Sequence, residues 1–328
     1  MPLKILKCGI QDTIQDCGRF GFSHLGVSPG GMMDTFAGKM ANVLVGNHAD
    51  KALLEMHSPA AVLQFTEDAL ISITGADFIP EINGQTVPLW HPIVVRKQSI
   101  LSFTGSRFGA RCYLAVHGGL FVEKWLGSFS TDLRAGAGGR RPGREDMLQI
   151  GYGEMSFSTL LKPGSVFQSL RWSPDVKSVY EESDIFFTTG KEYELLDEGS
   201  VQTLETEAFI VSDESNRMGY RLQGPPLQTS APVSMISVPV TFGTIQLLPQ
   251  GQLVILMADH QTMGGYARIG HVISAHLPKL AQYPAHHALR FRRVEPAEAE
   301  LLLTALSKEL QNLESLCLDH LKELLWRK

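Results

Sequence analysis

The sequence predicts a mainly β protein with a few helices and a long amphipathic helix at its C-terminal end. Three observations lead to this class. Short runs rich in valine, isoleucine, leucine and phenylalanine recur along most of the chain. The 31 glycines and 17 prolines lie between these runs, as turns between short strands require. After residue 295 the pattern changes, and apolar residues recur at the three- and four-residue spacing of a long helix.

The composition excludes several classes of protein. A chain of 328 residues can form two domains whose cores need no disulfides. The net charge of -5, without a long basic block, argues against nucleic-acid binding and a polybasic membrane surface. No signal peptide and no run near the length of a membrane span is present, so we expect a cytoplasmic protein. The cysteines lack a C-x-x-C pair, which argues against a zinc ribbon and a disulfide framework: Cys8, Cys17, Cys112 and Cys317.

The first half of the chain is predicted to hold one clear helix and many strands. The helix covers residues 34 to 45, with Asp34 as its N-cap. Short strands follow, and Asn83-Gly84 is typical of a hairpin turn between two of them. So many strands in so short a stretch predict a barrel or sandwich. The strands are expected at 53–56, 61–65, 70–73, 93–95, 100–103 and 112–116.

The second half begins after a more polar connecting region at residues 173 to 184. A second set of strands is predicted from about residue 186 to 291. Pro296 suits a first helical turn, and the helix that follows has leucines and one cysteine on one face. We therefore divide the chain into segments 1–184, 185–294 and 295–328. The helical face comprises Leu302, Leu306, Leu310, Leu313, Cys317, Leu321 and Leu324.

Two segments resemble known catalytic or nucleotide-binding motifs, but each lacks a residue that its motif requires. Residues 26 to 30 match G-x-S-x-G, but the residue after Ser28 is Pro29, which has no N–H for an oxyanion hole. This segment is therefore interpreted as a turn. Gly38-Lys39 is not a P-loop, because Met33 and Met40 replace the required glycine and hydroxyl residue.

The glycine-rich stretch from residue 117 to 153 leaves two interpretations open. Its backbone N–H groups and its four arginines could hold a phosphate or carboxylate. It could equally be a long surface loop with solvated arginines. The eleven histidines form no recognisable ligand pattern, so we expect no metal site.

Three polar clusters lie among the strands of the second half, at residues 215–222, 243–246 and 259–266. The first holds two arginines, which suit capture of a carboxylate, although a hairpin with salt-bridged flanks has the same composition. The third follows a buried apolar run and contains Gly264-Gly265, where a backbone can approach a ligand closely.

Read together, short motifs along the chain resemble one family. They include Gln15-Asp16 with Gly18-Arg19, Ala41-Asn42 with Gly46-Asn47, Gly127-Ser128 with Ser130-Thr131, 215–222, 243–246 and 261–266. In this order they are similar to the carboxyltransferase subdomain A and B family, also known as KipA or allophanate hydrolase subunit 2-like proteins. The resemblance covers about residues 5 to 291.

The resemblance implies a fold of two cyclophilin-like β-barrel subdomains. It also implies that the protein acts as one subunit of a complex. Bacterial members are the C subunit of 5-oxoprolinase, which together with the A and B subunits, the latter of related fold, hydrolyses 5-oxoproline to glutamate using ATP. Fused relatives form the carboxyltransferase part of urea carboxylase, so a carboxyltransferase component is a second possibility. A KipA-like regulatory protein that sequesters a kinase inhibitor is a third.

The resemblance also implies a set of site residues. Arg217 is expected to bind the substrate carboxylate, while Asp259 and Tyr266 orient the reacting amide or exchange protons with it. The sequence has no biotin-accepting A-M-K-M segment and no ATP-grasp, so ATP is expected at the level of the complex and biotin only on a separate carrier. The loop at 138–146 departs from the family's Gly-Gly-x-x-Gly-Arg pattern. The residues expected to bind substrate are Gln15, Asp16, Arg19, Asp34, Asn42, Asn216, Gln246 and Gln261.

Overall fold

A computed structural model describes residues 2–138, 141–151, 157–231, 233 and 235–326, and these fall into two compact units. Unit 1 comprises residues 1–19, 34–175 and 309–328, and unit 2 comprises residues 20–33 and 176–308. These units differ from the segments 1–184, 185–294 and 295–328. Residues 20–33 join the second unit, and the C-terminal helix is divided between both.

Unit 1 is built from two antiparallel sheets around one apolar core. Side chains alternate along each strand, so one face of each sheet supplies the core, for example Ile71 and Ile73 of β5 and Leu63 of β4. The larger sheet has the order β11 (Leu120–Phe121), β12 (Met147–Ile150), β1 (Pro2–Lys7), β4 (Val62–Phe65), β9 (Ile100–Phe103), β6 (Pro80–Ile82) and β7 (Gln85–Thr86). The smaller has the order β13 (Phe167–Ser169), β8 (Ile93–Val95), β5 (Ala69–Asp77), β10 (Phe108–Val116), β3 (Leu53–Met56) and β2 (Thr13–Gln15).

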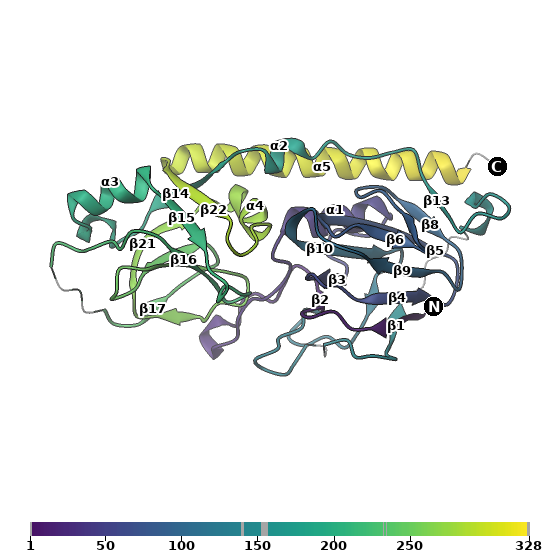
Figure 1. Cartoon of the computed structure of the whole chain (residues 1–328), viewed down its shortest axis with the longest axis horizontal. Helices are drawn as coiled ribbons and strands as arrows, with labels where there is room; N and C mark the ends of the chain where they lie inside the picture. Colours follow the sequence, from purple (N-terminus) through teal and green to yellow (C-terminus); the bar gives the residue numbers. More distant parts are fainter. Residues whose placement is uncertain (1, 139–140, 152–156, 232, 234, 327–328) are drawn as a thin grey trace. The chain divides into compact units, whose positions relative to one another are not determined.

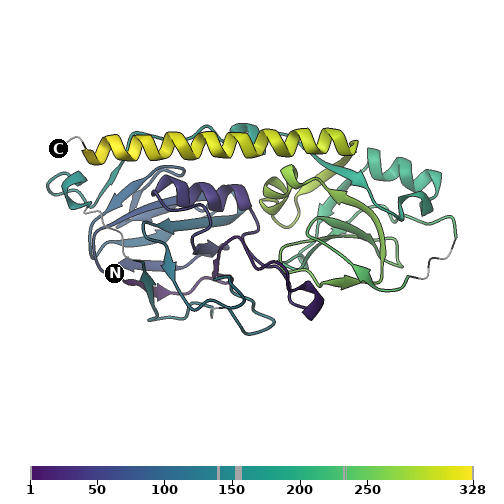
Figure 2. The ribbon, with the colours of Figure 1, turned by 180° about the vertical axis from the view of Figure 1, so that it is seen from behind.

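The helix α1 (Thr35–Leu44) lies across the strands of the smaller sheet in unit 1 (Figure 2). The predicted cap is confirmed, because the Asp34 carboxylate accepts the N–H of Ala37 at 2.8 Å. Hydroxyls of β5 fix the helix to the sheet: Ser72 donates to the carbonyl of Ala41, and Thr74 to that of Ala37. The predicted Asn83-Gly84 hairpin joins β6 to β7.

Unit 2 is a closed barrel, which Figure 1 shows with several of its strands labelled. Strands β14 and β22 pair in parallel and the other pairs are antiparallel. Its interior is apolar and includes Phe187, Tyr220 and Ile245. The mainly β prediction is therefore confirmed. The order around the barrel is β14 (Asp184–Thr189), β21 (Ala267–Val272), β18 (Thr244–Leu247), β19 (Leu253–Leu256), β16 (Gly219–Gln223), β15 (Ala208–Val211) and β22 (Ala288–Arg293).

Small elements complete the two units. A two-stranded sheet pairs β17 (Val238–Pro239) with β20 (Met263–Gly264). Helix α3 (Glu198–Thr206) was not foreseen from the sequence, because Leu204 is its only fully buried large apolar residue. The remaining short helices are α2 (Lys177–Tyr180), α4 (Leu277–Ala281), η1 (Ser23–Leu25), η2 (Ser158–Leu160), η3 (Tyr193–Leu195) and η4 (Ser274–His276).

Residues 20 to 33 complete unit 2 although they precede most of unit 1 in the chain. The Ser28 hydroxyl donates to the carbonyl of His260 at 2.6 Å, and the N–H of Gly30 donates to that of Ala258. Met33 packs into the barrel core. Ser28 is thus a structural contact of a turn.

The predicted C-terminal helix is a single helix, α5 (Pro296–Trp326). In unit 2 its Leu302 packs beside Phe186, and in unit 1 its Cys317 and Leu321 are buried. The side chain of Leu324 lies outside the described residues. Across the described ranges, no helix is both long and apolar enough to span a membrane.

Candidate functional site

In unit 1, Asp16 holds two distant segments of the chain together. Its carboxylate accepts hydrogen bonds from the hydroxyls of Ser128 and Ser130 at 2.6 Å each and from the N–H of Phe129, also at 2.6 Å. It also accepts the N–H of Gly18 at 2.8 Å. Four donors on one carboxylate fix the loop at 128–130 against the end of β2.

The guanidinium of Arg19 lies in the same network and is almost fully buried. It donates to the carbonyl of Ser130, lies 4.8 Å from the ring centre of Trp125, and reaches to 3.9 Å from the carboxylate of Asp132. A side chain at Gly138 would collide with it, so only glycine allows the backbone to cover this arginine so closely.

Gln15 completes the network but keeps an unused polar atom. Its amide donates to the hydroxyl of Thr13 at 3.1 Å and to the carbonyl of Thr131 at 3.4 Å. Among the described residues, the Gln15 Oε1 and Thr131 Oγ1 atoms are buried without a hydrogen-bond partner. Buried polar groups in this state mark a place for water or a ligand.

A cavity of about 570 Å³ borders this network in unit 1. Lys124 is the one cation among its described lining residues, and its ammonium lies 4.7 Å from the ring centre of Phe129. Lys124 and Trp125 were not among the residues expected from the sequence, although only Leu126 separates them from the motif at 127–131. The lining consists of Ile14, Phe121, Val122, Glu123, Lys124, Trp125, Gly136, Ala137, Gly138, Pro142, Asp146, Met147, Leu148 and Gln149.

The glycine-rich stretch contributes to the cavity wall in one part and to the protein surface in another, and its capture of an anion stays a prediction. Gly136 to Gly138 line the cavity, whereas the side chains of Arg134 and Arg144 are exposed. Residues 139 and 140 lie outside the described residues.

Two other expected substrate residues of unit 1 have structural contacts. Asp34 caps α1, as described above. The Asn42 amide donates to the carbonyls of Ala49 and Lys51 and accepts from the amide of Asn47. These bonds shape the turn after α1.

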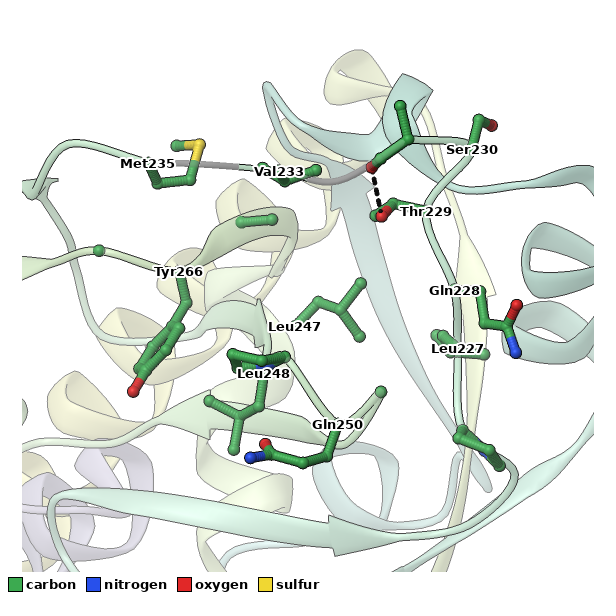
Figure 3. Close-up of a pocket in the computed structure, with 16 residues that line it drawn as sticks. Leu227, Gln228, Thr229, Ser230, Val233, Met235, Leu247, Leu248, Gln250 and Tyr266 are labelled. Atoms are coloured by element: carbon green, nitrogen blue, oxygen red, sulfur yellow. Dashed lines mark hydrogen bonds between the residues drawn. The ribbon is translucent and has the colours of Figure 1, made fainter.

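In unit 2, the residues expected to be catalytic do not converge on one point. Arg217 and Asp259 form an ion pair, with Nε to Oδ2 at 2.8 Å. Tyr266 instead lines a separate groove of about 760 Å³, to which neither Arg217 nor Asp259 contributes (Figure 3). The carboxylate that Arg217 holds in this structure is that of Asp259.

Gln246 is buried and packs against β20. A Cβ atom on Gly264 would lie 2.4 Å from the Gln246 Nε2, so a larger residue there would force the Gln246 amide to move. Among the described residues, this buried Nε2 has no acceptor. Gln261 is half-buried two residues after Asp259, while Asn216 is exposed and accepts the N–H of Met218 within its own loop.

Comparison with known proteins identifies relatives across most of the chain. The model of the family described as carboxyltransferase domain, subdomain A and B, matches residues 25–293. The sequence is 33% identical over 299 residues to the C subunit of 5-oxoprolinase from Escherichia coli, covering 90% of this chain and 93% of that protein.

Two solved structures extend the comparison. The crystal structure of the K. lactis urea amidolyase matches with a TM-score of 0.82 and 26% identity, over 95% of this chain and 20% of that chain. That of TTHA0988 matches with a TM-score of 0.76 and 29% identity, over 89% of this chain and 55% of that chain. This chain thus spans about a fifth and about half of those two proteins.

Proposed function

Because the chain belongs to the carboxyltransferase domain, subdomain A and B, family, we propose that it is the C subunit of an ATP-dependent 5-oxoprolinase. One observation carries this proposal. The chain aligns with 93% of the length of a stand-alone C subunit, whereas it covers only 20% of the solved urea amidolyase. The match thus covers nearly the full length of a 5-oxoprolinase C subunit.

The unit 1 cavity is the proposed place for the substrate. 5-Oxoproline carries a carboxylate at neutral pH, and Lys124 at the cavity lining supplies a cation for it. The unused Gln15 Oε1 and Thr131 Oγ1 belong to the network behind the cavity wall, although neither residue lines the cavity itself. Asp16 and Arg19 hold this wall in place and act as positioning residues.

The residues of unit 2 take other roles in this proposal. Gln246 is assigned a ligand-binding role within unit 2 itself: its unused N–H donates to a ligand oxygen, and this bond strengthens as charge develops on that oxygen. The Arg217–Asp259 pair positions residues 26–33, because Arg217 also donates to the carbonyl of Gly31 at 2.7 Å. Gln261, which is half-buried and precedes β20 in the chain, keeps its expected role as a ligand-binding residue of unit 2.

Partners and ATP belong to the complex as a whole. Opening a cyclic amide to glutamate consumes one water, and the coupled hydrolysis of ATP to ADP and phosphate supplies the energy. This sequence holds no nucleotide motif, so the nucleotide is assigned to the A or B subunits rather than to this chain.

The test is reconstitution from the purified A and B subunits and this chain. We expect phosphate and glutamate release that depends on 5-oxoproline and ATP and that is lost when this chain is omitted. A complex that assembles but releases neither product contradicts the proposal, and tight binding without turnover would favour a regulatory role.

A carboxyltransferase component is the second candidate, favoured by the TM-score of 0.82 with urea amidolyase. In that case a separate carrier would deliver carboxybiotin. The same preparation, supplied with a carboxylated biotin carrier and urea, distinguishes the two: carboxyl transfer without 5-oxoproline turnover would support this alternative.

A further inference from the structure

The groove of unit 2 is chemically unlike the cavity of unit 1. It opens at one end of the barrel, between residues 226–231, 233 and 235, the turn at 248–251 and residues 265–267 (Figure 3). Its floor belongs to the barrel core, because Leu227, Leu247 and Ala267 are buried there. A volume of about 760 Å³ is large enough for several side chains of a bound segment.

None of the described residues that line this groove carries a charge. Its polar groups are neutral: the phenol of Tyr266 and the carboxamides of Gln228 and Gln250 lie around an apolar floor (Figure 3). An ion that enters such a site loses its hydration without gaining a counter-charge. The substrate and products of the proposed reaction, and ATP, are all anions at neutral pH. The groove therefore suits none of them.

Apolar surface continues from the groove onto the neighbouring strands. Tyr266 and Met263 are 43% and 47% exposed, and Ile236, next to the lining residue Met235, is 87% exposed. The backbones that carry Ile236 and Tyr266 run beside each other, because β17 and β20 pair Val238 with Gly264 and the Met235 carbonyl lies close to Gly265. Contiguous exposed apolar side chains around a groove are typical of protein interfaces.

We propose that this groove is the docking site for an uncharged, apolar segment of a partner subunit. The proposal rests on the proposed function, which requires partner subunits. Apolar side chains of the segment would cover Leu227 and Leu247, and its backbone amides would bond to Gln228, Gln250 and Tyr266 at the rim. The absence of charge in the described lining selects against acidic and basic segments.

Charge placed in the groove tests the proposal. Val233→Glu and Gln250→Glu put a carboxylate at the mouth, where the side chain of Val233 is 37% exposed in the free protein. The matched controls are Ile210→Glu, at a residue 40% exposed on β15, and Gln252→Glu, exposed and outside the groove. Binding of each variant to the A and to the B subunit is measured by titration calorimetry, with circular dichroism as a check on folding.

We expect the groove variants to weaken binding to one of the two partners by about tenfold or more, and the controls by less than about twofold. At saturating partner concentration, turnover of the groove variants should return to that of the unchanged protein. Folded groove variants with unchanged affinity for both partners would overturn the proposal. So would self-association of the chain that the variants abolish, since a second copy would then be the occupant.

The docking proposal and the proposed function can fail independently in these experiments. If the unchanged subunits assemble but do not hydrolyse 5-oxoproline, the function fails while the affinities still decide the groove. If turnover is present and the groove variants bind normally, only the docking proposal fails.

Discussion

Arg217 and Asp259 form a two-point ion pair across 42 residues of sequence, with Nε and Nη2 of the guanidinium 2.8 and 2.9 Å from the two carboxylate oxygens. Arg217 is 8% exposed. A buried pair of this kind fixes the geometry of the end of β19 and, through the carbonyl of Gly31, of the loop at 26–33.

Arg217→Ala should destabilise the protein as well as lower activity. It leaves Asp259 as an uncompensated, largely buried charge, and breaking a buried pair costs about 3 kcal/mol. Urea unfolding of the two single variants and of the double variant Arg217→Ala/Asp259→Ala measures the loss in free energy of unfolding. The loss in the double variant should be smaller than the sum of the losses in the two single variants. Arg221→Ala, which breaks a half-exposed pair with Glu214, is the control and should cost less than about 0.5 kcal/mol.

Gln246→Leu should separate a ligand-binding role from a structural one. The change removes a buried donor that lacks an acceptor among the described residues, so stability should stay equal or rise by about 1 kcal/mol. Turnover of the reconstituted complex should nevertheless fall by about tenfold or more. Gln223→Leu, at an exposed position of β16, should leave both unchanged. Full activity of the Gln246 variant would remove this residue from the site.

Lys124→Met tests the cation of the unit 1 cavity. Loss of a charge-assisted bond to the substrate carboxylate should raise KM about tenfold or more, with less change in kcat. Lys7→Met, at an exposed position of β1 outside the cavity, should keep normal kinetics. A normal KM for the Lys124 variant would place the substrate elsewhere.

Asp16→Ala should loosen the loop that the carboxylate holds. Four donors lose their acceptor, among them the hydroxyls of Ser128 and Ser130. We therefore expect the free energy of unfolding to fall by about 2 to 4 kcal/mol. Hydrogen exchange should become faster at residues 127–132 and stay unchanged in the barrel of unit 2. Asp68→Ala, which removes one exposed contact to the N–H of Lys97, is the comparison. Equal protection of the loop in both variants would argue against this role.

His276 should make the protein less stable in mild acid. Burial, and to a smaller extent the charge of Lys279, lowers the pKa of His276 from 6.5 to about 4. Between those values the unfolded chain binds a proton that the folded chain does not, so stability falls as pH drops from 6.5 to 4. Because the His276 ring is partly exposed, its titration should lower the free energy of unfolding by about 1 to 2 kcal/mol over this pH range.

The His276→Asn variant keeps an acceptor near the N–H of Phe186 and removes the titration. Its unfolding free energy, followed from about pH 7 to pH 4, should fall less steeply than that of the unchanged protein. The exposed His48→Asn is the control. Parallel curves for all three proteins would contradict the assignment.

Much of the local structure followed from the sequence because period and turn chemistry act over a few residues. The strands at 53–56, 93–95 and 100–103 and the Asp34 cap were predicted at the bounds observed. Helix α3 was missed because it buries little apolar surface and so has no clear periodic pattern. The motifs also singled out Gln15, Asp16 and Arg19, which do form one network.

By itself, then, the sequence determined the class of fold, the positions of several strands and the family, since these depend on local patterns and on motifs in a fixed order. Only the tertiary structure decided which groups meet. It paired Arg217 with Asp259, joined Asp16 to a loop more than a hundred residues away, assigned residues 20–33 to the second unit, and opened an uncharged groove beside Tyr266. Contacts between distant segments depend on how strands pair and loops close, and no local pattern records them.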